Sequence, residues 1–199
     1  MPLWIIIGGN SSGKSAWGEE FIANTLGYSN VDYIATLDDS FPDPEGSLFR
    51  QKIINHQTRR PAGWKVWKEP FNPMGRILAL PPHHGALWDG VGPYIATMMS
   101  RPDSGQGVSA GHSYAQAGSG PPMDRMMEEW RHDLMRIGER PGDTVVVTEE
   151  TGFSILPVDP PTQYFVQALG QFNQLAAALA TGVIMVVAGL PMWFKGEAR

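Results

Sequence analysis

Short apolar runs and stretches of helical spacing alternate along this chain. Residues 3–7, 31–36 and 144–148 are apolar runs of strand length, and residues 183–188 form another near the end. Between these runs, apolar residues recur every three or four positions, a spacing that places them on one face of a helix. Short buried strands that alternate with amphipathic helices predict one α/β domain of three layers, with a mainly parallel central sheet.

Three segments carry the helical spacing. The first begins near residue 15, and we expect Gly27 to end it, because glycine readily adopts the left-handed conformation that terminates helices. We expect the Met and Trp residues of the second segment to lie in the core. The apolar positions are Trp17, Phe21, Ile22 and Leu26 in the first segment, Met123, Met127, Trp130, Leu134 and Ile137 in the second, and Phe165, Leu169, Phe172, Ala176 and Leu179 in the third.

The remaining segments carry weaker signals. Residues 48–56 predict a short helix, and residues 77–80 and 85–89 predict short strands. Residues 100–122 are rich in Gly, Ser and Pro and lack any periodicity. We interpret them as an insertion within a single domain of residues 1–199, and a lid over a binding site is the alternative.

Composition narrows the range of functions. The 199 residues carry a net charge of −5, and the pair Arg59-Arg60 is too small for the basic surface that nucleic acids require. No cysteine is present, which excludes disulfides and thiolate metal sites and fits a reducing compartment. The N-terminus lacks the pattern of a signal peptide, and the longest apolar run is too short to span a bilayer. We therefore expect a soluble cytoplasmic protein with no membrane span and no nucleic-acid partner.

The most informative motif lies directly after the first apolar run. Residues 8–15, GGNSSGKS, fit the pattern G-x-x-x-x-G-K-[ST] of a phosphate-binding P-loop between a strand and a helix. Glycines at both ends let the backbone curl until several N–H groups point at a phosphate. Lys14 can then reach the β- and γ-phosphates, and the Ser15 hydroxyl can ligate Mg²⁺. We therefore predict a P-loop fold that binds a nucleoside triphosphate through Gly8, Gly9, Asn10, Ser11, Ser12, Gly13, Lys14 and Ser15.

A P-loop by itself does not choose among kinases, ATPases, GTPases and nucleotidyltransferases. The second informative segment places His56 ahead of Arg59, Arg60 and the aromatic Trp64. Taken alone, such a histidine is more often a surface residue than a nucleophile. The two arginines can clamp phosphate oxygens with their planar guanidinium groups, and a solvated basic pair is the alternative.

The order of several blocks along the chain resembles one protein family. After the P-loop, the blocks are YIAT at residues 33–36, H-x-x-x-R-P-x-x-W from His56 to Trp64, ETGFSILP at residues 150–157, GQFNQ at residues 170–174 and AGLP at residues 188–191. Together they resemble the bifunctional adenosylcobinamide kinase / adenosylcobinamide-phosphate guanylyltransferase family of cobalamin biosynthesis. The resemblance covers nearly the whole chain apart from the insertion at residues 100–122.

The resemblance implies two reactions at one P-loop site. In the first, a nucleoside triphosphate such as ATP phosphorylates the aminopropanol hydroxyl of adenosylcobinamide, a corrinoid. In the second, GTP guanylylates a histidine, which corresponds to His56, and adenosylcobinamide phosphate then takes the GMP. A neutral imidazole with an ordinary pKa of about 6.5 suits this nucleophilic role. The implied catalytic residues are thus His56 and Lys14, with Mg²⁺ as cofactor, and the implied assembly is a homo-oligomer, specifically a trimer.

The same resemblance supplies further candidate contacts. Asp89, at the end of the predicted strand 85–89, corresponds to an acid that contacts the nucleotide, and a carboxylate there can also hold Mg²⁺. Glu150 matches the acid of the family block N-E-V-G. The implied nucleotide contacts outside the P-loop are Ala35, Thr36, Arg59, Arg60, Glu69 and Asp89, and the implied metal ligands are Ser15, Asp89 and Glu150.

Departures from the family pattern leave other hypotheses open. Asn55 replaces a histidine, and Lys68 stands where the family has a guanylate-contacting Glu, with Glu69 as the neighbouring substitute. Residues 90–97 lose a Thr and an Asn, and residues 163–167 lose two Arg and one Asp, which removes permanent charges and bidentate donors. The alternatives are a divergent nucleotide-binding relative that has lost one or both activities, or a P-loop kinase of another small metabolite.

Overall fold

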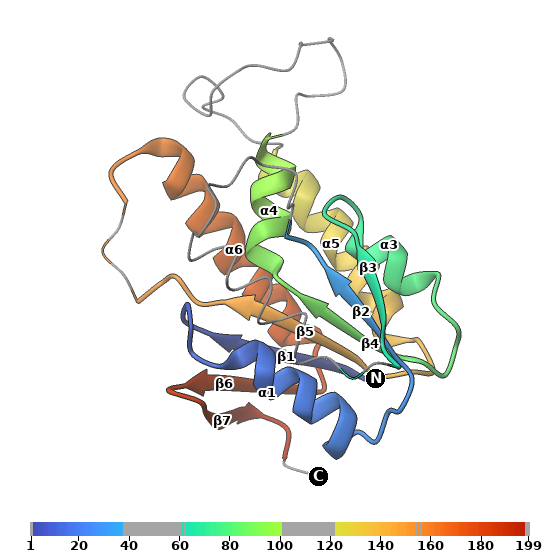
Figure 1. The fold of residues 1–199 in the computed structure, drawn as a ribbon. Coiled ribbons are helices and arrows are strands. Elements are labelled where there is room, and N and C mark those ends of the chain that lie inside the picture. Colours follow the sequence, from blue (N-terminus) through green and yellow to red (C-terminus); the bar gives the residue numbers. More distant parts are fainter. Residues whose placement is uncertain are drawn as a thin grey trace, which may run out of the picture.

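A computed structural model describes residues 2–37, 61, 63–100, 122–153, 155 and 157–197. The described residues form a sheet of seven strands in the order β3-β2-β4-β5-β1-β6-β7 (Figure 1). All neighbours pair in parallel except β7, which is antiparallel to β6. The predicted mainly parallel sheet is confirmed. The strands are β1 (Leu3–Gly8), β2 (Val31–Ala35), β3 (Lys65–Lys68), β4 (Gly85–Asp89), β5 (Thr144–Glu149), β6 (Gly182–Val187) and β7 (Leu190–Lys195).

Helices cover both faces of the sheet, so the predicted three-layer α/β architecture is also confirmed. On one face lies α1 (Lys14–Glu20), which continues as the π-helix η1 (Phe21–Thr25). The other face carries the remaining described helices (Figure 1). They are α3 (Pro73–Leu78), α4 (Val91–Ser100), α5 (Met123–Gly138) and α6 (Pro160–Leu179). No helix among the described residues is long and apolar enough to cross a membrane.

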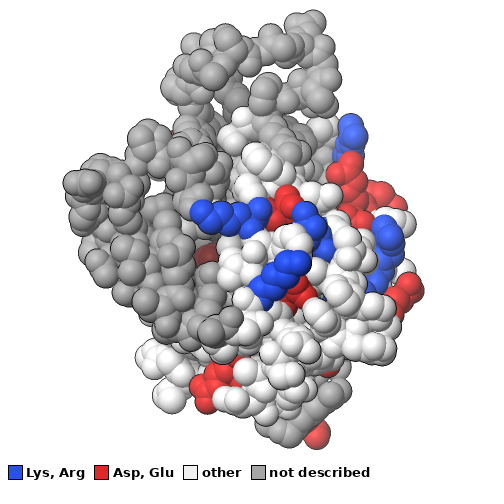
Figure 2. Space-filling model, turned by 45° about the vertical axis from the view of Figure 1, so that its right-hand side comes forward, with Lys and Arg blue, Asp and Glu red and all other residues white. Residues whose placement is uncertain are grey.

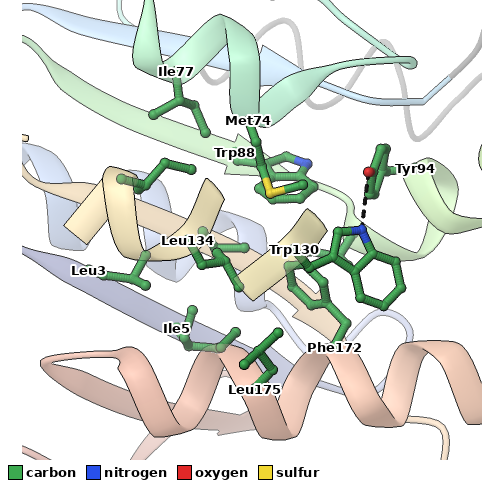
Figure 3. Packing of buried hydrophobic residues seen from close by; sticks show 14 of the residues in the cluster. Leu3, Ile5, Met74, Ile77, Trp88, Tyr94, Trp130, Leu134, Phe172 and Leu175 are labelled. Atoms are coloured by element: carbon green, nitrogen blue, oxygen red, sulfur yellow. Dashed lines mark hydrogen bonds between the residues drawn. The ribbon is translucent and has the colours of Figure 1, made fainter. Parts of the chain in front are cut away.

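Alternation along the strands divides the core into two clusters. In β1, Trp4 and Ile6 pack toward α1 and η1, whereas Leu3 and Ile5 pack toward the larger helical layer. In that layer, Trp130 of α5 lies between Tyr94 of α4, whose hydroxyl accepts its indole N–H at 3.2 Å, and the ring of Phe172 of α6 (Figure 3). The two clusters hold the sheet between its helices and thereby fix the positions of the strand ends.

The helices predicted from apolar spacing are confirmed as α1 with η1, α5 and α6. Gly27 follows η1 with a φ of 76°, as a glycine that ends a helix should. The strand predicted at residues 77–80 is wrong, because residues 77 and 78 continue α3. Its start is set by the Asn72 side chain, which accepts the N–H of Gly75, and by Pro73 in the first turn. A run of four apolar residues cannot by itself distinguish strand from helix.

The sequence pattern did not predict the edge strands β3 and β7 or the helix α4. The strand β3 is a short and largely exposed K-V-W-K segment, and β7 contains Pro191, which an edge strand tolerates. The helix α4 begins immediately after β4 and was not predicted. The helix predicted at residues 48–56 and nearly all of the proposed insertion, residues 101–121, lie outside the described residues.

Charges of both signs are interspersed on the described surface. Figure 2 shows Lys and Arg side chains next to Asp and Glu side chains on the face that it presents. Two such pairs in the structure are Arg76 with Glu69 at 3.6 Å and Arg136 with Asp133 at 4.0 Å. The basic side chains in this view are thus partly balanced by neighbouring acids.

Candidate functional site

The P-loop connects β1 to α1, the strand–loop–helix context that its motif requires. Its backbone is tightly bent, with Ser11 at a φ of 59° and Gly13 at a φ of 93°. A Cβ atom added at Gly8 would lie 2.6 Å from both the Ser12 hydroxyl and the Val186 carbonyl oxygen. A Cβ at Gly9 would instead meet open space. The two glycines of the motif that flank its variable positions, Gly8 and Gly13, are therefore the ones that the geometry requires.

The turn between β6 and β7 supports this loop from one side. The N–H of Gly189 donates to the carbonyl oxygen of Ser12 at 2.8 Å. A Cβ added at Gly13 would lie only 3.2 Å from the Cα of Gly189, so the two glycines let the turn and the loop touch through their backbones. The hairpin that includes the unpredicted strand β7 thus helps to fix the P-loop.

Lys14 extends back over the loop. Its side chain is almost fully buried, and its Nζ donates to the carbonyl oxygen of Gly9 at 3.3 Å. The same ammonium lies 3.7 Å from Oε1 of Glu149 at the end of β5. The lysine is therefore held at the loop by groups that a phosphate can replace.

Ser15 and Asp89 meet across the start of α1 and the end of β4. The Ser15 hydroxyl donates to Oδ1 of Asp89 at 3.0 Å, and the hydroxyl of Tyr33 donates to Oδ2 of the same carboxylate. Hydroxyl and carboxylate oxygens are the donors that Mg²⁺ prefers. Among the described residues no three His, Asp or Glu side chains gather as a metal cage.

Glu149 is a site residue that the sequence reasoning missed. The N–H of Gly92 in the first turn of α4 donates to its Oε2 at 2.9 Å, and its Oε1 faces Lys14. Burial raises the pKa of Glu149, and the nearby charge of Asp89 raises it further, although Lys14 and the Gly92 N–H oppose the shift. Strand alternation offered the signal, because Val145 and Val147 of β5 pack toward α1, and Glu149 continues that face.

Glu150, the predicted metal ligand, makes different contacts from those of Glu149. Its backbone N–H donates to the carbonyl oxygen of Gly8 at 3.1 Å, and its carboxylate accepts the N–H of Gly152. The side chain lines a mostly apolar cavity of about 370 Å³ together with Ile7 and Met185. The structure therefore brings Ser15 and Asp89 together and sets Glu149, not Glu150, beside Lys14. Metal ligation by Glu150 stays a prediction.

Thr36 and Ala35 lie at the end of β2, beside Asp89. The Thr36 side chain is fully buried, and its hydroxyl contacts the carbonyl oxygen of Gly90 and accepts the indole N–H of Trp88 at 3.4 Å. Gly90 itself has a φ of 105°, which allows the sharp turn from β4 into α4. In this structure Thr36 shapes that turn, and nucleotide contacts of Ala35 and Thr36 stay predictions.

The side chain of Glu69 contacts the start of α3. Its Oε1 accepts the N–H of Asn72 at 3.1 Å, and its Oε2 pairs with Arg76 at 3.6 Å. Its N–H donates to the carbonyl oxygen of Ala35 at 2.8 Å, which ties the segment to β2. A nucleotide contact of Glu69 therefore has to compete with Arg76. The predicted nucleophile His56 and the predicted phosphate clamps Arg59 and Arg60 lie outside the described residues.

Comparison with known proteins extends over nearly the whole chain. A family model described as "Cobinamide kinase / cobinamide phosphate guanyltransferase" matches residues 4–194. The bifunctional adenosylcobalamin biosynthesis protein CobP of Pseudomonas aeruginosa is 30% identical over 195 residues, with 97% of each chain covered. The bifunctional adenosylcobalamin biosynthesis protein CobU of Salmonella typhimurium is 27% identical over 197 residues, covering 96% of this chain and 98% of that protein. Among solved structures, the flagellar accessory protein FlaH of Methanocaldococcus jannaschii matches with a TM-score of 0.45 at 14% identity, covering 100% of this chain and 82% of that one.

Proposed function

This chain belongs to the cobinamide kinase / cobinamide phosphate guanyltransferase family of transferases, and we propose that it carries out both reactions at its P-loop. In the kinase reaction, a nucleoside triphosphate phosphorylates the aminopropanol hydroxyl of adenosylcobinamide. In the second reaction, GTP transfers GMP to adenosylcobinamide phosphate through a guanylylated His56. The observation that carries the proposal is the cluster of Lys14, Ser15 and Asp89 at the end of a P-loop in a family member.

The cluster of Lys14, Ser15 and Asp89 can stabilise the negative charge that develops on the phosphates in both reactions. Lys14 is held by a carbonyl oxygen and by Glu149, so its ammonium can turn to phosphate oxygens and stabilise the leaving group. Ser15 and Asp89 would hold Mg²⁺, which when bound neutralises charge on the phosphates. Peptide N–H groups of the bent loop and the start of α1 add a local positive field.

The two reactions differ in the phosphorus atom that is attacked. In the kinase reaction, the substrate hydroxyl attacks the γ-phosphorus, and a nucleoside diphosphate leaves. In the guanylylation, a neutral ring nitrogen of His56 attacks the α-phosphorus of GTP, and pyrophosphate leaves. The resulting covalent intermediate divides one displacement into two easier ones. Arg59 and Arg60 would hold phosphate oxygens in both cases.

Residues 163–167, which lack two arginines and one aspartate of the family pattern, affect the proposed binding of the corrinoid. These residues belong to the first half of α6, and the ring of Phe165 comes within 3.6 Å of a Cβ placed at Gly92. The segment that differs from the family pattern therefore approaches the start of α4 through Phe165. We infer that corrinoid binding relies on fewer charged contacts here than the family pattern provides.

Labelling with GTP tests the guanylyltransferase half. The protein is incubated with Mg²⁺ and GTP labelled at the α-phosphate, and the chain is examined for label that is labile in acid and stable in base. We expect label in the wild type and none in His56→Ala, with His132→Ala as a matched control that keeps it. A wild-type chain that takes up no label would refute the guanylyltransferase reaction.

We further propose a cytoplasmic homo-oligomer, specifically a trimer. This follows from the family resemblance and from the biosynthetic substrates, which are intracellular metabolites. Light scattering coupled to size-exclusion chromatography tests the assembly, and a molar mass close to that of one chain, 21.8 kDa, would refute it.

A further inference from the structure

One carboxylate at the P-loop, that of Glu149, holds Lys14 but takes part in no chemical step of the two reactions proposed above. Glu149 lies at the carboxyl end of β5, between the strands that carry the P-loop and Asp89. We propose that Glu149 is an additional catalytic residue of the kinase reaction, whose carboxylate accepts the proton that the attacking hydroxyl loses. This inference rests on the proposed kinase function and adds a residue to it.

The first argument is position. Oε1 of Glu149 lies 3.7 Å from Nζ of Lys14, the group that would contact the γ-phosphate. A hydroxyl that attacks this phosphorus must come close to the same phosphate oxygens. A carboxylate beside Lys14 is therefore within reach of the proton that is transferred.

The second argument is orientation. The Gly92 N–H holds Oε2 at 2.9 Å, so one oxygen is anchored while the other is directed toward the P-loop. A Cβ atom at Gly92 would lie 2.7 Å from that oxygen, so a larger residue would displace the carboxylate. The start of α4 is thus shaped to keep Glu149 in this place.

The bonds balance without any further reactant. The alcohol oxygen forms a bond to the γ-phosphorus, and the bond from that phosphorus to the bridging oxygen of the β-phosphate breaks. The nucleoside diphosphate leaves with the electron pair of that bond. The hydroxyl proton passes to Oε1 of Glu149 and later to water. Attack by a neutral ring nitrogen of His56 has no hydroxyl proton to transfer, so Glu149 serves the kinase reaction selectively.

By the resemblance that matches Glu150 to the acid of the block N-E-V-G, Glu149 corresponds to the Asn of that block.

Kinetics of Glu149→Gln test the proposal, with Glu149→Asp as a variant that keeps the carboxylate. Glu128→Gln, on the exposed side of α5, is the matched control. Phosphorylation of adenosylcobinamide is followed against pH, and uptake of GMP from labelled GTP is measured on the same preparations. We expect kcat for phosphorylation to fall about 100-fold or more in Glu149→Gln, which is the usual contribution of a general base. We also expect the loss of rate at low pH to disappear in this variant, GMP uptake to stay within about threefold, and Glu149→Asp to recover part of kcat.

Four other outcomes would overturn the inference. An unchanged kcat with a raised KM for the nucleotide would show that Glu149 only positions Lys14. A parallel loss of both reactions would show a role in holding the loop. A wild-type chain without kinase activity would refute the proposed kinase function, and the role of Glu149 with it, whereas an active wild type with an equally active Glu149→Gln refutes the role of Glu149 alone.

Discussion

The hydroxyl of Ser15 donates a hydrogen bond to Oδ1 of Asp89 at 3.0 Å. These residues are 74 positions apart, and the contact joins the first turn of α1 to the carboxyl end of β4. It forms because β1 and β4 both pair in parallel with β5, so their carboxyl ends meet at one edge of the sheet. The pair combines a hydroxyl and a carboxylate, the protein groups that hold the Mg²⁺ of a bound nucleotide in P-loop enzymes.

Lys14→Met should weaken nucleotide binding. The substitution keeps the length of the side chain but removes the charged donor that is directed over the loop. A charge-assisted hydrogen bond contributes about 1.5–3 kcal/mol, so we expect affinity for Mg-GTP to fall about ten- to a hundredfold by calorimetry. Lys65→Met, at an exposed position of β3, is the control that should bind normally. Equal affinities of the two variants would contradict the role of Lys14.

Asp89→Asn should raise the requirement for Mg²⁺. The amide oxygen can still accept the Ser15 hydroxyl, but the negative charge is lost. Groups that hold or orient a metal ligand typically change metal affinity about 10- to 100-fold, so we expect half-maximal activity at about tenfold more Mg²⁺. Asp124→Asn, exposed on α5, should leave the magnesium titration unchanged. An unshifted titration in Asp89→Asn would rule out its part in the metal site.

Two neighbouring glycines of the P-loop should respond differently to alanine. At Gly8 the added methyl group would lie 2.6 Å from two oxygen atoms, one of them in the backbone of β6, whereas Gly9 faces open space. We expect Gly8→Ala to lower the free energy of unfolding by about 1–3 kcal/mol and Gly9→Ala to change it by less than about 0.5 kcal/mol. Urea denaturation measures both, and similar losses in the two variants would show that the loop is bent differently.

Glu149 should make stability depend on pH. Burial raises its pKa in the folded chain above the ordinary value of 4.5, so the folded state holds this proton more tightly than the unfolded state does. The ionised carboxylate therefore destabilises the fold above the raised pKa, and this penalty disappears as pH falls through that pKa toward 4.5.

Glu149→Gln removes the titrating group and reports this penalty directly. We expect the variant to have a higher Tm than the wild type at about pH 8 and nearly the same Tm at about pH 4. A stabilised variant that is also a slower kinase would fit the trade-off between stability and activity at functional sites. A lower Tm at about pH 8 would mean that the ion pair with Lys14 outweighs the cost of burial.

Local signals predicted the parts of the site that depend on short segments. The glycines and Lys14 belong to one continuous motif, and Asp89 ends a buried strand, so they could be proposed as site residues before the fold was known. Their binding of nucleotide and metal stays a prediction. Glu149 and Glu150 are adjacent acids at a strand end, and motif matching favoured Glu150. The choice depends on the face of β5 to which each belongs, which strand alternation decides: Thr148 bonds Asn173 of α6, so Glu149 takes the face toward α1.

The edges of the sheet could not be predicted in the same way. The strands β3 and β7 bury few of their side chains, so their sequences lack the apolar alternation that marks a half-buried strand. Their positions are set by pairing with β2 and β6, and for β3 that partner lies about thirty residues away along the chain, beyond any local pattern. The hydrogen bond from Gly189 to Ser12 could not be predicted either, because it depends on the hairpin that β7 completes.

The central claim is that one P-loop serves both reactions, and conversion of the corrinoid tests it most directly. Adenosylcobinamide is incubated with the protein, Mg²⁺, ATP and GTP, and the products are followed by mass spectrometry. The proposed function predicts the phosphate ester first and then adenosyl-GDP-cobinamide, with His56→Ala stopping at the phosphate ester and Lys14→Met yielding neither product. Unmodified adenosylcobinamide after incubation with the wild-type protein would contradict the claim.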